Sequence, residues 1–307
     1  MATQFYDRVD EYLRERVKAA FRYADLMGSG SRRLPDRYGK TESTAAAQMR
    51  SLELQMIESN LSGKTAVITG ASKGLGKAMA LSLASVGVNV ALVSRDIEQL
   101  NLAKQAVESV GGKAQVFSAN VSEEDQVRKL ERDVIAAFDG VDILINNAGI
   151  NLRKQLVEFT LEEWHHVLDT NLTSVFLMCR SFVPHMKAKG YGRIINLASI
   201  MSHVSLPGRS AYSASKSALL GLTRALALEL AAESITVNGI SPGPFATEMN
   251  TTLIQNPELN QQFLSKIPVG RWGRVEEIGQ LALYLCSEAA GFITGTDILI
   301  DGGWTAQ

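Results

Sequence analysis

The sequence predicts an α/β fold, in which a doubly wound parallel sheet of about seven strands follows a helical N-terminal extension. Three observations lead to this prediction. From Lys64 onward, short apolar runs alternate with segments of helical periodicity. A glycine-rich turn over residues 69–76 joins the first apolar run to the first of those helices. The length of 307 residues leaves room for one large α/β domain plus an appendage.

Seven apolar runs are the candidate strands, and each is too short for a typical helix. They cover residues 65–69, 88–93, 114–117, 141–145, 194–197, 236–240 and 298–300. Helical periodicity follows the first run over residues 75–86, and long helices are expected over about 161–187 and 212–231. Strands buried on both faces and joined by crossover helices form a parallel sheet with helices on both sides.

Residues 1–60 precede this pattern and are predicted to be a helical arm and linker, with the α/β domain spanning residues 61–307. Apolar residues recur at helical spacing up to about Met27, residues 28–33 break the pattern, and a second short helix is expected around 45–58. Acidic residues, beginning with Asp7 and Asp10, argue against an organelle targeting peptide. We expect the arm to pack on the main domain or on a neighbouring subunit.

Composition limits the partners and the compartment. The formal net charge of −1 gives no reason to expect nucleic acid or an anionic membrane as a partner, and no apolar run reaches the length of a membrane span. Cys179 and Cys286 are too few for a disulfide framework, so buried thiols and a cytoplasmic location are predicted. His, Cys and Asp residues show no metal-ligand spacing, and we expect no metal.

The glycine-rich turn reads Thr-Gly-Ala-Ser-Lys-Gly-Leu-Gly over residues 69–76. Glycines permit a tight turn and let the backbone approach a phosphate group. The helix that follows offers unpaired N–H groups and a favourable dipole to an anion. Because the turn lies between a predicted strand and a predicted helix, it indicates a dinucleotide-binding site rather than an ordinary glycine loop.

Tyr212 and Lys216 stand four residues apart, so on a helix both side chains share one face. A nearby ammonium is expected to bring the pKa of the tyrosine, normally about 10, toward neutrality, as a general acid or base requires. Ser199 lies thirteen residues before Tyr212, at the end of a predicted strand, where α/β sheets present ligand-contacting residues. Taken alone, a Tyr-x-x-x-Lys spacing also fits an ordinary surface helix.

The order of the motifs favours the functional interpretation. The glycine-rich turn is followed by Asn-Asn-Ala-Gly at 146–149, then by Asn171, Ser199, Tyr212 and Lys216, and by Pro-Gly at 242–243. In this order the chain resembles the compact single-domain branch of the short-chain dehydrogenase/reductase family over about residues 61–304. The resemblance implies a Rossmann-type domain that transfers hydride between a nicotinamide cofactor and a ketone or secondary alcohol.

The resemblance also implies roles for the four catalytic positions. Tyr212 exchanges a proton with the substrate oxygen, and Ser199 hydrogen-bonds the same oxygen. Lys216 lowers the pKa of Tyr212 and binds the nicotinamide ribose, while Asn171 holds a water in a proton relay. All four positions are intact, so an enzyme is favoured over the alternative, a catalytically idle NADP-binding module that acts through its N-terminal arm.

A larger set of residues is implied to bind the cofactor. It comprises Gly70, Ser72, Lys73, Gly74, Leu75, Gly76, Arg95, Asn120, Val121, Asn147, Ala148, Gly149, Tyr212, Lys216, Pro242, Gly243, Phe245 and Thr247. Lys73 and Arg95 place two cations where a 2′-phosphate would lie, so NADP(H) is predicted. In the alternative, both are ordinary solvated charges and Asp96 binds the ribose.

The substrate is less well defined by the sequence. Segments that follow the later strands are expected to form its pocket, and they carry Arg153, Met201 and His203 as candidate contacts. Arg153 also fits an exposed loop arginine. The overall pattern resembles 3-oxoacyl carrier-protein reductases and gluconate 5-dehydrogenase-like enzymes, which implies a 3-oxoacyl thioester or a keto sugar acid. Family analogy further implies a homotetramer built through the two long helices.

Overall fold

The computed structural model describes residues 60–187 and 189–307, so the predicted N-terminal arm lies outside the described residues. The described chain forms a parallel sheet in the order β3-β2-β1-β4-β5-β6-β7. Its strands are β1 (Thr65–Thr69), β2 (Asn89–Ser94), β3 (Lys113–Ser118), β4 (Ile143–Asn146), β5 (Gly192–Leu197), β6 (Ile235–Pro242) and β7 (Asp297–Ile300). All seven predicted strands are therefore confirmed, with ends that differ by at most two residues.

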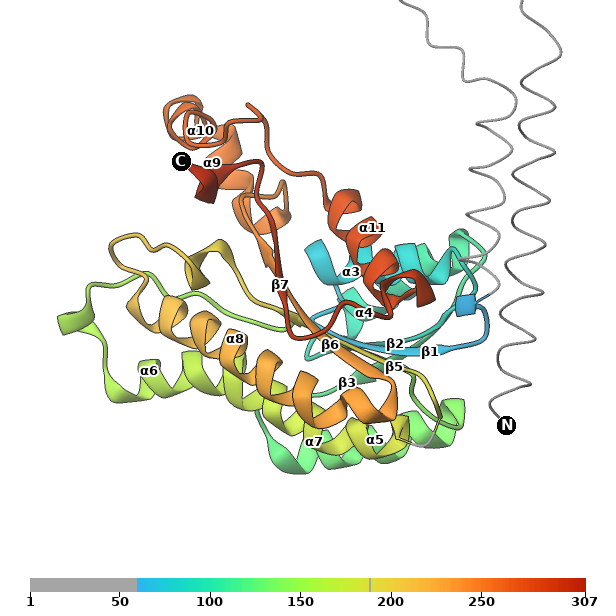
Figure 1. Cartoon of the computed structure of the whole chain (residues 1–307). Helices are drawn as coiled ribbons and strands as arrows, with labels where there is room; N and C mark the ends of the chain where they lie inside the picture. Colours follow the sequence, from blue (N-terminus) through green and yellow to red (C-terminus); the bar gives the residue numbers. More distant parts are fainter. Residues whose placement is uncertain (1–59, 188) are drawn as a thin grey trace, which may run out of the picture. The chain divides into compact units, whose positions relative to one another are not determined.

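Helices cover both faces of the sheet, as the apolar runs predicted (Figure 1). One face is covered by α3 (Gly74–Ala84), α4 (Ile97–Ser109) and α11 (Val275–Cys286), and the other by α5 (Glu124–Phe138), α7 (Ser174–Met186) and α8 (Ser210–Leu230). Alternate strand residues serve the two cores: Ile68 packs with the first group and Val67 with the second. The doubly wound fold is confirmed.

Three shorter helices complete the described part of the fold, and the first of them packs beside α8. They are α6 (Leu161–Leu168), α9 (Thr251–Gln255) and α10 (Pro257–Leu264). The last two lie beyond the carboxyl ends of the strands (Figure 1). They belong to the segment between β6 and α11, which the chain places over the edge of the sheet where parallel folds bind ligands.

The predicted helix over residues 161–187 is not continuous. The structure shows α6, then a π turn over Asp169–Thr173, then α7. The wider turn leaves the Ser174 N–H bonded to the Asp169 carbonyl, five residues earlier. Its middle residue, Asn171, is completely buried. Single π turns of this kind occur often at functional sites, because they turn one side chain out of the normal helical register.

The order of winding reverses between β1 and β4. To one side of β1 lie β2 and β3, and to the other side lie β4 and the later strands. Their connecting segments leave the sheet in opposite directions at this point, which opens a crevice at the carboxyl ends of the strands. Among the residues that the structure describes, no helix is long and apolar enough to cross a membrane.

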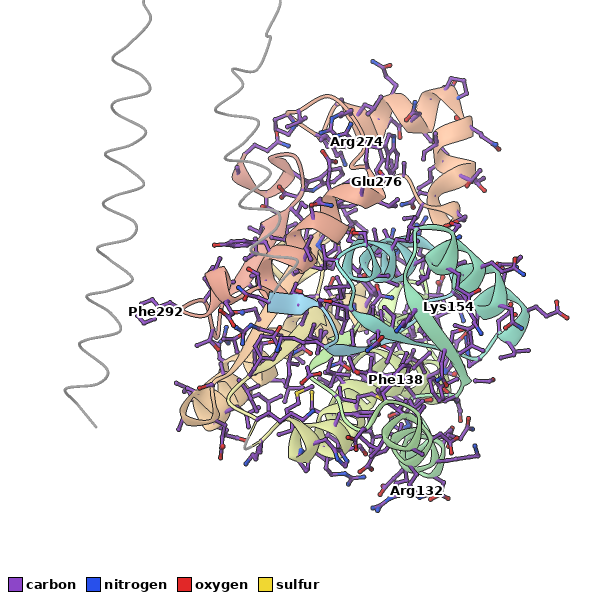
Figure 2. All side chains as sticks on the ribbon, turned by 90° about the vertical axis from the view of Figure 1, so that its right-hand side faces the viewer. Arg132, Phe138, Lys154, Arg274, Glu276 and Phe292 are labelled. Carbon is purple, nitrogen blue, oxygen red and sulfur yellow. The ribbon has the colours of Figure 1, made fainter. Side chains whose placement is uncertain are left out.

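Replacing Phe182 tests the core between the sheet and α7. This side chain is fully buried in the second core, so Phe182→Ala should lower the free energy of unfolding by about 3–5 kcal/mol through lost burial and a residual cavity. Phe292 is fully exposed and projects from the surface (Figure 2), so Phe292→Ala should change it by less than about 0.5 kcal/mol. Urea unfolding followed by circular dichroism measures both, and equal losses would contradict this core assignment.

Candidate active site

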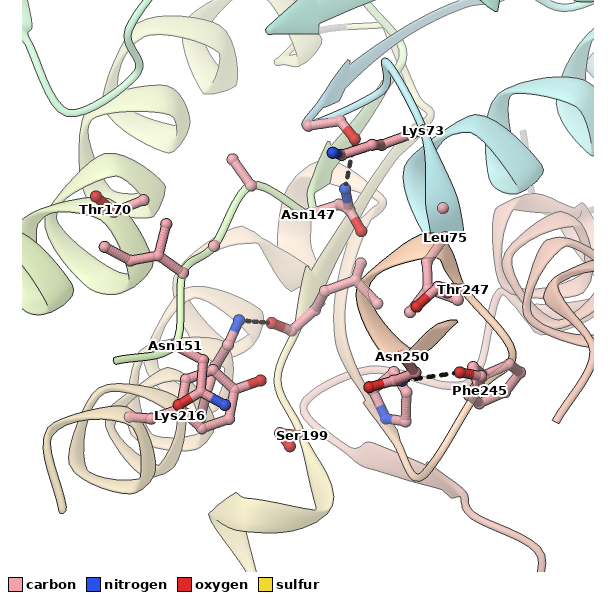
Figure 3. A pocket seen from close by; sticks show the side chains of 18 of the residues that line it. Lys73, Leu75, Asn147, Asn151, Thr170, Ser199, Lys216, Phe245, Thr247 and Asn250 are labelled. Carbon is pink, nitrogen blue, oxygen red and sulfur yellow. Dashed lines mark hydrogen bonds between the residues drawn. The ribbon is translucent and has the colours of Figure 1, made fainter. Parts of the chain in front are cut away.

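A cavity of about 590 Å³ opens at the carboxyl ends of the strands. Its walls come from the glycine-rich turn, the ends of β2 to β6, the start of α8 and the segment after β6. Figure 3 shows Lys73 toward one end of this cavity and Ser199 and Lys216 toward the other. All the predicted site residues line it except Gly76, Asn171 and His203. The switch point of the sheet therefore gathers most of the predicted site.

The glycine-rich turn is held in place by Asn147. Its side-chain amide donates to the carbonyl oxygens of Thr69 (2.9 Å) and Gly70 (3.0 Å). The Thr69 hydroxyl in turn accepts the N–H groups of Asn147 and Ala148, both at 3.0 Å. These bonds fix the turn after β1 to the segment after β4, so Asn147 acts on the shape of the cavity through the backbone.

Two glycines in the turn are required by conformation or by close approach. Gly70 has a left-handed φ of +63°, and a Cβ atom there would lie only 2.8 Å from the Asn147 amide nitrogen. Gly76 does not line the cavity; a Cβ atom there would collide with the Gly70 carbonyl oxygen. Gly76 thus lets α3 begin against the turn, with its N-terminal N–H groups toward the cavity.

Lys216 lies on α8 and is almost completely buried. Its ammonium donates to the Leu197 carbonyl oxygen at the end of β5, at 2.5 Å. Burial lowers the pKa of Lys216 to about 8, because the charged form loses its hydration. The nitrogen lies 5.9 Å from the centre of the Tyr212 ring, so helical spacing has brought the two side chains together as predicted.

The pKa of Tyr212 differs from the sequence-based expectation. Burial raises the pKa of the Tyr212 phenol, and a hydrogen bond with Ser199 and the charge of Arg209 act in the opposite direction. Lys216 was expected to lower this pKa; it is itself buried and donates to the Leu197 carbonyl, and the net shift of the Tyr212 pKa is upward. The phenol is consequently held in its protonated form at neutral pH.

Ser199 follows β5 and begins a short 3₁₀ turn. Its side-chain oxygen accepts the Met201 N–H at 3.1 Å, which fixes the hydroxyl in one orientation. A hydroxyl that accepts one bond in this way keeps its own proton to donate. Ser199 and Tyr212 therefore present two hydroxyl donors to the same part of the cavity.

Asn171 lies beneath the cavity and does not line it. Its side-chain oxygen accepts the Ile150 N–H (2.8 Å), and its amide donates to the Ile150 carbonyl (2.9 Å) and the Ser215 hydroxyl (3.0 Å). Ser215 then donates to the Tyr212 carbonyl at 2.7 Å. These bonds join the segment after β4 to α8, and the water-holding role of Asn171 stays a prediction.

One acid, Asp96, lines the cavity at the end of β2. Asp96, which the alternative required for ribose binding, caps α4 by accepting the Gln99 N–H at 3.1 Å. Arg95 and Lys73 are exposed, line the same cavity, and form no salt bridge with another described residue. This end of the cavity therefore combines two available cations with a helix N-terminus, which fits an anionic group.

The remaining cofactor candidates also line the cavity. Asn120 and Val121 lie at the end of β3, and the side-chain oxygen of Asn120 accepts the Ser122 hydroxyl at 2.9 Å. After β6, Asn250 donates to the Phe245 carbonyl at 2.9 Å (Figure 3). Other candidates with this placement are Ser72, Gly74, Leu75, Ala148, Gly149, Pro242, Gly243 and Thr247. A cavity of this size, which runs past the ends of several strands, suits a dinucleotide.

Two of the three candidate substrate residues line the cavity, and the third does not. Arg153 and Met201 line the cavity, as expected. His203 does not: its imidazole lies 2.7 Å from the Asp297 carboxylate at the start of β7. We therefore do not retain His203 as a substrate contact, since its ring is directed at the sheet edge. Groups of three or more metal-ligating side chains are absent from the described part of the chain.

Other cavity residues were not anticipated from the sequence. Arg209 is the residue that precedes α8, three positions before Tyr212. Phe263, Trp272 and Trp304 form an aromatic wall, in which Phe263 stacks on Trp272 with ring centres 5.5 Å apart. The charge and position of Arg209 beside the Tyr-x-x-x-Lys motif were visible in the sequence. The aromatic residues come from separate segments, so spacing gave no signal for them.

The two cysteines lie outside the cavity and behave as predicted. Cys179 on α7 and Cys286 at the end of α11 are both buried and free. Burial raises the pKa of each thiol to about 12, so neither is a reactive thiolate at neutral pH.

Comparison with known proteins places this geometry in a family. The sequence profile described as Enoyl-(Acyl carrier protein) reductase matches residues 70–305. Gluconate 5-dehydrogenase from Gluconobacter oxydans is 38% identical over 252 residues, which cover 81% of this chain and 97% of that protein. The 3-oxoacyl-[acyl-carrier-protein] reductase FabG from Aquifex aeolicus is 36% identical over 248 residues, covering 80% and 99% respectively.

Solved structures agree. A Beutenbergia cavernae protein, proposed to be an NAD(P)-dependent gluconate 5-dehydrogenase and containing NADP at low occupancy, has a TM-score of 0.76 and 36% sequence identity. The match covers 81% of this chain and 99% of that chain. With its parallel sheet, its glycine-rich turn and the clustered Ser199, Tyr212 and Lys216, the chain belongs to the short-chain dehydrogenase/reductase family and is a nicotinamide-dependent oxidoreductase.

Proposed function

We propose that the protein interconverts a ketone and a secondary alcohol with NADP(H). The observation that carries this proposal is the convergence of two hydroxyl donors, Ser199 and Tyr212, with the buried Lys216 at one end of the cavity. The alternative of an idle binding module finds no support in this geometry, because each of these side chains lies in a position to act. When bound, the nicotinamide supplies or accepts the hydride.

Ser199 and Tyr212 have different roles at the substrate oxygen: one donates a hydrogen bond and the other transfers a proton. Ser199, oriented by the Met201 N–H, donates a hydrogen bond that positions the carbonyl and stabilises its developing negative charge. The Tyr212 phenol, whose pKa is raised by burial, is protonated at neutral pH and gives its proton to the forming alkoxide. The neutral phenol donates the proton in ketone reduction, and in the reverse reaction the phenolate would accept it from the alcohol.

Lys216 and Asn171 are proposed to act without contacting the substrate oxygen. The Lys216 ammonium faces the cavity beside Gly149, so it would bind the nicotinamide ribose and balance the charge left on Tyr212. Asn171 is proposed as a positioning residue, since it joins Ile150 to Ser215 and so fixes the segment after β4 against α8.

NADP(H) is preferred over NAD(H) in this proposal. Lys73 and Arg95 are the cations available for a 2′-phosphate, whereas Asp96 is engaged in capping α4. The NADP found in the Beutenbergia cavernae relative supports the same choice. The cofactor residues predicted from the sequence are proposed to keep their roles, with Gly76 and Asn147 shaping the turn.

The substrate is proposed to be a keto sugar acid or a 3-oxoacyl thioester, following the two kinds of relative. We also propose a cytoplasmic homotetramer. Exposed apolar side chains on the two long helices, Phe176 on α7 and Leu228 on α8, support association through this face. Two free buried thiols are consistent with a reducing compartment.

Tyr212→Phe removes the proposed proton donor and keeps the ring. We expect kcat/KM for ketone reduction to fall by about 10²–10⁴-fold, as for loss of a general acid. NADPH affinity should change by less than about threefold, because the hydroxyl is one of many contacts. Tyr284→Phe, at an exposed position on α11, is the matched control. Loss of NADPH absorbance measures turnover, and an active Tyr212→Phe enzyme would contradict the mechanism.

Lys73→Ala and Arg95→Ala test the cofactor choice. Each should lower kcat/KM for NADPH by about 10–100-fold through a lost charge-assisted bond to the 2′-phosphate, with a much smaller effect for NADH. Lys113→Ala is the control: it removes an exposed cation at the amino end of β3 and should leave kcat/KM unchanged with NADPH and with NADH. Steady-state kinetics with the two cofactors decide this, and equal losses for NADPH and NADH would refute the proposed phosphate contact.

Stability against pH tests the charge state of Lys216. Its pKa in the folded protein is about 8, below the ordinary value of 10.5, so between these pH values the unfolded chain binds one more proton than the folded chain. Wild-type stability should therefore rise with pH across this window relative to Lys216→Met, by up to about 3 kcal/mol. Urea unfolding at pH 7, 8.5 and 10 measures the difference in the free energy of unfolding between wild type and Lys216→Met. A difference independent of pH would show that the lysine titrates normally.

A further inference from the structure

Two arginines come together at the end of the cavity that holds Tyr212. Arg153 lies in the segment after β4, and Arg209 lies directly before α8. The backbone joins these two segments, because the Lys154 N–H donates to the Gly208 carbonyl at 3.3 Å. The contact places residues 153 and 209 on neighbouring stretches of chain, and the charge of Arg153 acts on Arg209.

Neither arginine is neutralised by an acid in the part of the chain that the structure describes. The nearby acid is already engaged: Glu163 binds the Lys154 ammonium at 2.7 and 2.8 Å and accepts the Thr160 N–H. One terminal nitrogen of Arg209, Nη1, is buried without a hydrogen-bond partner. A buried N–H group without a hydrogen-bond partner is costly, so this half-buried side chain is one whose hydrogen bonds are incomplete.

The cavity contains only two acids among its described lining residues, and neither lies at this end. Asp96 caps α4 beyond β2, and the Glu248 carboxylate faces Gly74 in the glycine-rich turn. Burial, and after it the like charge of Arg153, lower the pKa of Arg209. An anion bound between the two arginines would offset their like charges and accept hydrogen bonds from the guanidinium groups that line the cavity.

The position of the pair limits the size of the ligand. Arg209 is three residues from Tyr212, about one turn of α8, and its charge acts on the Tyr212 phenol. A ligand that reaches both groups must carry its anionic group a few atoms from the reacting carbonyl. The phosphate of a carrier-protein thioester lies at the far end of a long arm from its ketone, so it does not meet this condition.

We propose that Arg153 and Arg209 form a carboxylate-binding subsite, and that the substrate is a small keto acid rather than an acyl thioester. The proposal rests on the ketone-reductase function inferred above and chooses between its two substrate classes. The planar guanidinium groups suit the two oxygens of a carboxylate. Arg209 contacts substrate in this assignment, and Arg153 completes the same contact from the opposite segment.

A binding experiment tests the subsite without requiring turnover. Trp272 and Trp304 line the cavity, so their fluorescence reports occupancy of the enzyme saturated with NADP⁺. D-gluconate and D-sorbitol differ only in a carboxylate against a hydroxymethyl group, and sorbitol 6-phosphate supplies a different anion. We expect gluconate to bind at least about tenfold more tightly than either. Equal binding of gluconate and sorbitol, or tighter binding of the phosphate, would overturn the carboxylate assignment.

Arginine variants identify the residues responsible. Arg209→Gln and Arg153→Gln should each weaken gluconate binding by about 10–100-fold and leave sorbitol binding within about threefold. Arg209→Lys keeps the charge but loses the forked geometry and should fall between wild type and Arg209→Gln. Arg132→Gln is the matched control, because Arg132 projects from α5 (Figure 2) and does not line the cavity. Undiminished gluconate binding in both glutamine variants would refute the subsite.

Kinetics separate failure of the subsite from failure of the reductase function. The ketones 5-keto-D-gluconate and L-sorbose differ by the same carboxylate, and the ratio of their kcat/KM values cancels any general loss of active enzyme. The ratio should favour the acid by at least about tenfold in wild type and fall toward unity in Arg209→Gln. Reduction of both ketones at one rate would refute the subsite alone. Carboxylate-selective binding without any reduction would refute the reductase function alone.

Discussion

The buried ammonium of Lys216 is the constraint on which the rest of the site depends. A charge held away from water is stable only where fixed oxygens replace its hydration. Here the Leu197 carbonyl at the end of β5 supplies one such oxygen. Strand β5 must therefore end beside the first turns of α8, and the same register brings Ser199 and Tyr212 to one end of the cavity. The hydrogen bond between Lys216 and Leu197 thus ties the catalytic residues of α8 to the sheet.

Two asparagines hold the surrounding loops to this arrangement. Asn147 binds the glycine-rich turn to the segment after β4, and Asn171 binds that segment, through Ile150, to Ser215 on α8. Together they connect the proposed phosphate end of the cavity to the proposed reaction end. The π turn around Asn171 is part of this connection, since it presents a completely buried amide to groups on two other elements. Precise placement of the reacting groups follows from these bonds, which is what hydride transfer requires.

The sequence was most informative where a local pattern determines the structure. The first strand, residues 65–69, was predicted to the residue, because a short apolar run there is bounded by a lysine and a glycine. The π turn was missed, since it depends on packing and not on residue type. The direction of the Tyr212 pKa was also missed, because burial outweighs a lysine that is itself buried. Arg153 and Arg209 are brought together by a backbone contact between distant loops, which no spacing rule describes.

The most direct test of the central claim follows the hydrogen that the cofactor transfers. The enzyme would be supplied with NADPH deuterated at the reactive C4 position and with a panel of ketones that includes 5-keto-D-gluconate and a 3-oxoacyl thioester. Mass spectrometry and NMR would then locate deuterium in the products. The account predicts one deuterium on the carbon that carried the carbonyl, and none on the new hydroxyl oxygen. Tight NADPH binding with no deuterium in any product would contradict it.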